Sequence, residues 1–277
     1  MVDRRKRPTI GFLTANIHTG AARALWPGVV DAARQHDVNL ICFPGGGLRV
    51  QADFESQRNA LYDLVNAGSV DGLVSWASAV GVALDRDQVI SFHQRYRPLP
   101  MVSLARPMEG IPALSVDSYQ GMREVIAHLI DVHGYRRLAF IRGPESHYYA
   151  QERYRAYLDV LKEYSIPFDP QLVTRPMHWE AGAEAIQMLL DERALRPHID
   201  FQAVVAVSDL LALDALKTLQ ARGIRVPGDV AVAGFNDSME GRLTTPPLTS
   251  VALPFYEQGT GAVAALLAQL AGEPVPQ

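Results

Sequence analysis

The sequence alternates short apolar runs with longer segments of helical periodicity, and this alternation limits the fold more than any other feature. In the first half, helical patterns near 21–35, 54–66 and 85–96 separate apolar runs at 9–13, 39–43, 72–76, 101–104 and 113–116. In the second half, helical patterns near 119–133, 150–164, 179–191, 209–222 and 255–271 are interleaved with runs at 138–141, 172–174, 203–207 and 231–235. This order is typical of parallel strands covered by helices on both faces. It predicts two successive α/β units of about four strands each.

Polar side chains follow several of the predicted strands. They are Thr14, Asn16, Arg142, Ser208, Asp209, Asn236 and Asp237. In open parallel sheets, ligands bind beyond the carboxyl ends of the strands, and a cleft between two such units is a natural binding site. Guanidinium, amide and hydroxyl groups together can bind a molecule with several oxygens. The pattern therefore predicts a cleft for a sugar or a similar small polar molecule.

The sequence contains no specific signature of catalysis. G-x-S-x-G, H-E-x-x-H, C-x-x-C and the phosphate-loop pattern are all missing. Gly45–Gly47 follows a predicted strand but lacks the dinucleotide-binding spacing, which favours a flexible turn. His128 and His133 are five residues apart, so they do not share a helix face as metal ligands would. We expect no enzyme activity, no cofactor and no bound metal.

Composition and charge narrow the class of partner. The net charge of −4 argues against a broad nucleic-acid-binding surface, and the basic run 4–7 is interpreted as a solvated tail. Cys42 is the only cysteine, lies in an apolar run and is interpreted as a buried small hydrophobe. No stretch approaches the ~20 apolar residues that span a bilayer, and no secretory signal pattern opens the chain. We expect a cytoplasmic protein with no membrane partner.

Six segments resemble one family closely. They are 116–121 (VDSYQG), 128–130 (HLI), 133–144 (HGYRRLAFIRGP), 153–157 (RYRAY), 223–237 (GIRVPGDVAVAGFND) and 246–251 (PPLTSV). In this order they resemble the sensor domain of LacI-type transcription regulators, over most of residues 8–272. The resemblance implies a periplasmic-binding-protein-like fold: two doubly wound parallel-sheet lobes, joined by crossing strands, with an effector in the cleft between them. The N-terminal lobe is then expected at 1–117 plus 252–277, and the C-terminal lobe at 118–251.

The resemblance also implies roles for individual residues. Arg153 occupies the position of the family's effector-binding arginine; the alternative is a salt-bridge residue on a helix surface. Trp179 stands where sugar-binding relatives place a stacking aromatic; a core tryptophan is the alternative. Thr14 and Asn16 are expected to line the first lobe's edge of the cleft, and Phe255 to supply a pocket aromatic.

Two positions depart from the usual pattern of the family. Ser208, before Asp209, stands where relatives usually carry Asn, and Asn236 stands where they usually carry Asp. An amide in place of a carboxylate removes a charge-assisted acceptor. The sugar specificity of the relatives therefore cannot be transferred to Ser208, Asp209 and Asn236, although all three are expected to bind ligand.

The partners that the resemblance implies are a small-molecule effector and a second copy of the chain. The candidate faces for a homodimer lie in the N-terminal lobe, on the helices near 21–35 and 54–66. Relatives begin with a DNA-binding headpiece of about sixty residues. Since the first predicted strand starts near Thr9, we expect no direct DNA binding by this chain. The parent is then a regulator whose headpiece is missing or a larger signalling protein with the sensor at its start; an exported solute-binding protein is the alternative.

Overall fold

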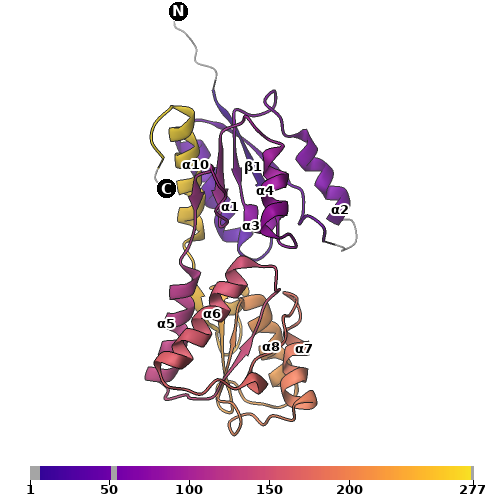
Figure 1. The fold of residues 1–277 in the computed structure, drawn as a ribbon, viewed down its shortest axis with the longest axis vertical. Coiled ribbons are helices and arrows are strands. Elements are labelled where there is room, and N and C mark those ends of the chain that lie inside the picture. The colour runs from indigo at the N-terminus through magenta and orange to yellow at the C-terminus, as the bar shows by residue number, and fades with distance from the viewer. Residues whose placement is uncertain (1–6, 51–54, 276–277) are drawn as a thin grey trace, which may run out of the picture. The chain divides into compact units, whose positions relative to one another are not determined.

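The computed structural model describes residues 7–50 and 55–275 and divides them into two compact units (Figure 1). The first unit contains the described residues up to Val116 and from Pro254 onwards, and the second is Asp117–Leu253. The last helix of the chain thus returns to the unit in which the chain began.

The first unit has a five-stranded parallel sheet in the order β2-β1-β3-β4-β5. Its strands are β1 (Thr9–Thr14), β2 (Asn39–Pro44), β3 (Gly72–Ser75), β4 (Met101–Leu104) and β5 (Ala113–Leu114). Its helices are α1 (Ala22–Gln35), α2 (Glu55–Arg58), the 3-10 helix η1 (Asn59–Leu64), α3 (Ala77–Val80), α4 (Arg86–Gln94) and α10 (Phe255–Leu270). The central strands are fully buried, as expected for a sheet covered on both faces.

Helices α1 and α10 lie side by side although they come from opposite ends of the chain (Figure 1). Their backbones approach closely at two glycines. A Cβ on Gly28 would collide with the carbonyl of Tyr256, and one on Gly259 would lie 2.6 Å from the Leu25 carbonyl. Glycine is required here because only a missing side chain permits this spacing. The contact fastens the returning helix to the first unit.

The second unit has a four-stranded parallel sheet in the order β6-β7-β8-β9. Its strands are β6 (Leu138–Ile141), β7 (Ala203–Ala206), β8 (Ala231–Asn236) and β9 (Thr249–Ala252). Helix α5 (Ser118–Asp131) packs against α6 (Tyr148–Glu163), and α7 (Gly182–Gln187) against α8 (Asp209–Ala221), and the two pairs lie on opposite sides of the sheet (Figure 1). Short helical segments complete the unit: η2 (Pro170–Leu172), the π-helix η3 (Met188–Glu192) and α9 (Met239–Arg242).

The predicted fold class is confirmed: both units are α/β with purely parallel sheets. One predicted strand is not formed, and two predicted helices differ in type and bounds from the expectation. The expected strand at 172–174 forms only an isolated bridge, Phe140 to Val173, after a proline-initiated 3-10 turn. The expected helix at 54–66 is four residues of α-helix followed by 3-10 helix, and residues 51–54 lie outside the described part. The expected helix at 179–191 begins only at Gly182 and ends as a π-helix.

Other predictions concern single side chains. Residues 4–6 of the basic run lie outside the described residues, while Arg7 forms an ion pair with Asp37 at 3.1 Å. Cys42 is half-buried, and burial raises the pKa of its thiol to about 12, so the thiolate form is disfavoured. Within the described residues, no helix is long and apolar enough to cross a membrane, and no three His, Cys, Asp or Glu side chains are grouped so that they could hold a metal ion.

Candidate functional site

The carboxyl ends of the second unit's strands bring several predicted site residues to one edge of the sheet. Arg142 follows β6, Val207 and Ser208 follow β7, and Asn236 ends β8. Helix α8 begins at the same edge, as helices that follow parallel strands do. Ligands of open α/β sheets bind at such edges. We call this the β6–β8 edge.

Arg153 extends from α6 to the β6–β8 edge and is almost completely buried, with 5% of its surface exposed. Its Nη1 donates to the carbonyl of Val207 at 2.6 Å, and its Nη2 donates to Ser118 Oγ at 3.1 Å. The guanidinium carbon lies 3.7 Å from the centroid of the Phe235 ring, a cation–π arrangement. Burial lowers the pKa of Arg153 to about 9, so the group remains charged at neutral pH. The alternative interpretation as a surface salt-bridge residue is therefore wrong.

Arg153 also has an unfilled donor. Its Nε is buried and has no hydrogen-bond partner in the described structure, and both of its other partners are neutral oxygens. Buried polar groups without partners are rare in proteins, and each one calls for an explanation, such as a water molecule, an ion or a functional role. Sequence reasoning did not find the partners of Arg153. Ser118 begins the helix after a predicted strand, which was the only signal that could have pointed to it.

Asp209 lies at the same edge but is used within the protein. It is 2% exposed; one carboxylate oxygen accepts from the Ser238 amide and the other from Ser250 Oγ, both at 2.6 Å. Gly234 makes room for it, because a Cβ there would collide with the carboxylate. Ser208 is the N-cap of α8, and its Oγ accepts from the Leu211 amide at 3.4 Å. The hydrogen bonds of both residues therefore stabilise the β6–β8 edge.

Asn236 lies at a strained turn at the end of β8. Its φ is 114° and that of Asp237 is 51°, two consecutive non-glycine residues in a region that L-residues rarely adopt. Asp237 is held by an ion pair with Arg242, and its amide donates to Ser250 Oγ at 2.9 Å. Such strain clusters at functional sites. The Asn236 side chain is partly exposed and keeps the role of a candidate ligand contact.

Trp179 is half-buried and packs partly on the core of the second unit. Its ring meets His147 edge to face, with centroids 4.8 Å apart. The His147 Nδ1 in turn accepts from the Ala150 amide at 3.3 Å and caps α6, the helix that carries Arg153. His147 was missed by sequence reasoning, because histidine is not a typical N-cap residue.

In the first unit, three candidates lie near the carboxyl ends of its strands. Thr14 ends β1 fully buried, and its hydroxyl donates to the Asn16 carbonyl at 2.9 Å. Asn16 Oδ1 accepts from the backbone of His18 and Thr19, which forms the turn leading into α1. Phe255 begins α10, with its ring 6.5 Å from that of Trp76, which follows β3 and was not predicted.

The Gly45–Gly47 turn, predicted to be flexible, lies beside these residues and is closely packed. All three glycines are buried. Asn59 Nδ2 donates to the Gly45 carbonyl at 2.7 Å, and the Tyr62 hydroxyl is 2.7 Å from the Gly46 carbonyl. A Cβ on Gly45 would lie 2.5 Å from the Tyr62 ring. The missing side chains at Gly45 and Gly47 therefore permit this close packing.

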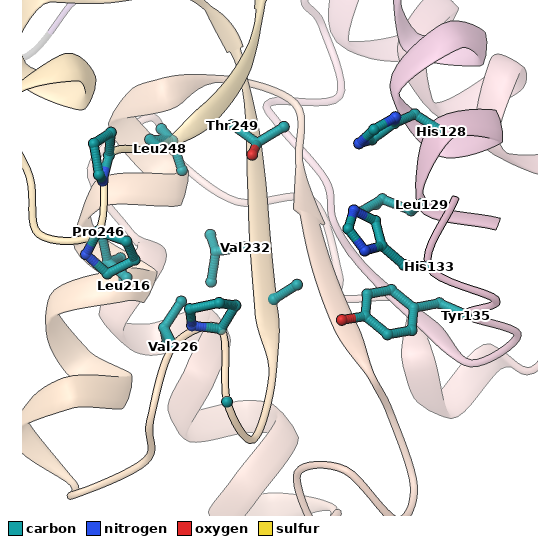
Figure 2. A pocket seen from close by; sticks show the side chains of 14 residues that line it. His128, Leu129, His133, Tyr135, Leu216, Val226, Val232, Pro246, Leu248 and Thr249 are labelled. Carbon is teal, nitrogen blue, oxygen red and sulfur yellow. The ribbon is translucent and has the colours of Figure 1, made fainter. Parts of the chain in front are cut away.

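A separate cavity of about 300 Å³ lies in the second unit (Figure 2). It is bordered by Ala231 and Thr249, the first residues of β8 and β9, and so lies at the opposite end of the sheet from Asn236. His133 stacks on Tyr135 in its wall, with centroids 5.4 Å apart. None of the predicted site residues lines this cavity.

Two parallel α/β units, with the last helix returning to the first, define the class of bilobal binding proteins. The sequence profile described as "periplasmic binding protein-like domain" matches residues 126–277. The chain belongs to this family, and its predicted likeness to the sensor domain of LacI-type regulators is confirmed.

Individual relatives are regulators. The HTH-type transcriptional repressor CytR of Escherichia coli (strain K12) is 30% identical over 220 residues, 79% of this chain and 62% of the relative. The solved transcriptional regulator CelR–cellobiose complex has a TM-score of 0.77 at 28% identity, over 98% of this chain and 81% of that one. A LacI family transcriptional regulator from Mycobacterium smegmatis has a TM-score of 0.81 at 26% identity, over 96% and 92%. The matched region thus spans about three fifths of CytR.

Proposed function

We propose that this chain is the effector-binding part of a LacI-type regulatory protein, and that its effector is a small polar molecule such as a sugar. The observation that carries the proposal is Arg153, a buried guanidinium with a free donor at the β6–β8 edge. Support comes from the CelR relative, which was solved with cellobiose. The related proteins are regulators, and the proposed activity is binding without chemistry.

The proposed ligand contacts divide by how their side chains are used. Arg153 is buried but keeps an unfilled donor, and Trp179 and Asn236 are partly exposed. The largely buried ring of Phe255 is the aromatic candidate in the first unit. Thr14, Asn16, Ser208 and Asp209 have hydrogen bonds within the protein, so their proposed contribution is to shape the ligand-binding edges. A ligand that touches both units favours their closed arrangement and shifts its population, which is the proposed signal.

A thermal-shift screen of sugars, nucleosides and amino acids tests this function. At 100 times its dissociation constant, a ligand of the folded state stabilises it by about 2.7 kcal/mol, and the unfolding midpoint rises accordingly. Arg153→Ala is expected to abolish the shift. Arg196→Ala is the matched control, because Arg196 is an exposed arginine of the same unit that is paired with Asp200 and lies before β7, away from the β6–β8 edge. A hit that survives Arg153→Ala would place the pocket elsewhere.

The output of the sensor is the second part of the proposal. The CytR relative is an HTH-type repressor, which supports a DNA-binding partner domain supplied by the rest of the protein. A larger signalling protein with another output domain is the second candidate, and an exported solute-binding protein the third. Regulators act in the cytoplasm, where we place this protein. The reading frame of the parent gene distinguishes the three: a helix-turn-helix upstream selects the first, and a secretory signal the third.

A homodimer through the first unit is also proposed. Helix α1 buries its apolar residues within its own unit and exposes a face that includes Arg23, Pro27 and Asp31, while Leu64 of η1 is 58% exposed. Light scattering at micromolar concentration is expected to give twice the chain mass of 30.4 kDa. Leu64→Asp should shift the mass toward the monomer, with Val132→Asp, an exposed residue of the second unit, as the control. A monomeric wild-type chain at this concentration contradicts the dimer.

A further inference from the structure

The charge of Arg153 is not balanced by the groups that it contacts. A buried cation is costly unless an anion or a set of strong hydrogen bonds compensates it. Here the two acceptors are the Val207 carbonyl and the Ser118 hydroxyl, and Nε has none in the described structure. The aromatic face of Phe235 compensates only in part, since a cation–π contact contributes about 2 kcal/mol when desolvated.

The acids along the β6–β8 edge are used by other partners. Asp209 is the nearest in sequence to the Val207 carbonyl that Arg153 holds, but its two oxygens accept from Ser238 and Ser250. Asp237 forms an ion pair with Arg242. Glu145 pairs with Arg142 at 2.6 Å. None of these carboxylates hydrogen-bonds Arg153, although the charge of Asp209 acts on it at longer range.

Helix termini add to the positive potential. Ser118 is the first residue of the 14-residue helix α5, and Ser208 caps the 13-residue helix α8. Arg153 bonds to Ser118 and to the carbonyl of Val207, immediately before Ser208, so both N-termini adjoin its guanidinium. Helix N-termini carry partial positive charge and favour anions. Arginine, with its planar fork of donors, fits a carboxylate or phosphate better than it fits a single hydroxyl.

We propose that the effector carries an acid group, a carboxylate or a phosphate, and that Arg153 binds this group. The inference rests on the proposed effector-binding function and narrows it from small polar molecules to acidic ones, such as a sugar acid or a sugar phosphate. Neither Asn236 nor Trp179 adds a competing negative charge, so they are suited to the uncharged remainder of the ligand.

Inorganic phosphate is the first probe. The unfolding midpoint of the chain is measured in increasing phosphate against chloride at constant ionic strength. We expect a saturable rise with a dissociation constant on the order of 1 mM, an affinity at least tenfold weaker in Arg153→Met, and no change in Arg196→Met, whose arginine is exposed and paired with Asp200 away from this edge. Arg153→Lys keeps the charge but loses the fork, and an intermediate affinity is expected. It also replaces Arg153→Met if that variant does not fold. Acetate is measured in the same way as the carboxylate probe. If phosphate and acetate both act like chloride, or both act equally on wild type and Arg153→Met, the inference is overturned.

Matched sugars separate the two acid groups and test the function independently. Isothermal titration compares glucose, glucuronate and glucose 6-phosphate. At least tenfold tighter binding of one acidic sugar than of glucose supports the inference and identifies the carboxylate or the phosphate as the group bound. Equal or tighter binding of the neutral sugar, dependent on Arg153, overturns the inference but leaves the proposed function standing. A third outcome is phosphate binding that depends on Arg153 together with no hit in the screen of neutral and acidic small molecules. That outcome contradicts the proposed effector-binding function but not the binding of an acid group by Arg153.

Discussion

Replacing Asp209 with alanine is expected to destabilise the second unit by about 3 to 5 kcal/mol. Its buried carboxylate accepts two short hydrogen bonds, from the Ser238 amide and from Ser250 Oγ. These connect the start of α8 to the turn after β8 and to β9. Alanine leaves both donors without their acceptor and leaves a gap beside Gly234. Urea unfolding followed by circular dichroism measures the loss.

Asp214→Ala on the same helix is the matched control. The Asp214 carboxylate is partly exposed and accepts from the Ala183 amide at 2.6 Å, so its removal is expected to cost about 1 kcal/mol. Asp209→Asn keeps the shape and one acceptor oxygen and should fall between the two alanine variants. If Asp209→Ala costs no more than Asp214→Ala, Asp209 does not fasten the edge, and its predicted role as a direct ligand contact gains weight.

The second large effect is a loss of stability in mild acid caused by His93. This imidazole in α4 is buried; its Nδ1 donates to the Val89 carbonyl and its Nε2 accepts from the Ser75 hydroxyl, both at 2.7 Å. Burial lowers the pKa of His93 from 6.5 to about 4, while the hydrogen bond to Val89 raises it and the charges of Arg95 and Arg106 lower it further.

The direction of the pH effect on stability follows from which state, folded or unfolded, binds the proton. Between pH 6.5 and 4 the unfolded chain protonates His93 while the folded chain does not, so stability is complete above pH 6.5 and falls as the pH decreases to 4. A separation of this size corresponds to about 3 kcal/mol. Urea unfolding of wild type and His93→Gln at several pH values checks it. Between pH 6.5 and 4, the free energy of unfolding of the wild type should fall by this amount more than that of the variant. If the two free energies change with pH in parallel, His93 is not responsible.

Local sequence patterns were sufficient for most of the fold. The run at 203–207 forms a buried central strand, and the helix expected near 85–96 is α4, capped by Asp85 with Gln88 completing a capping box. These elements depend on neighbours within a few residues. The run at 172–174 failed because a strand also needs a partner along its length, and only Val173 has one, Phe140.

The location of the candidate site could be predicted from the sequence, but not which of its side chains have hydrogen-bond partners within the protein. The resemblance located Arg153, Ser208, Asp209 and Asn236, and the structure brings Arg153 to the same edge as the residues after β7. Which of these side chains keeps a free donor depends on partners that lie far along the chain. Val207 is 54 residues from Arg153, and Ser250 is 41 residues from Asp209. The spacing of residues along the sequence does not indicate which distant residues will form hydrogen bonds.

The sequence by itself therefore determined the α/β class, the order of its elements and the edge at which a ligand is expected, because periodicity and strand ends are local properties. The tertiary structure alone decided the state of each polar group at that edge. It uses Asp209 internally, pairs Asp237 with Arg242 and leaves Arg153 buried with one donor unfilled. Burial and hydrogen-bond partnership arise only when distant segments meet, and they distinguish a residue whose polar atoms are all used within the protein from one that keeps an unfilled donor.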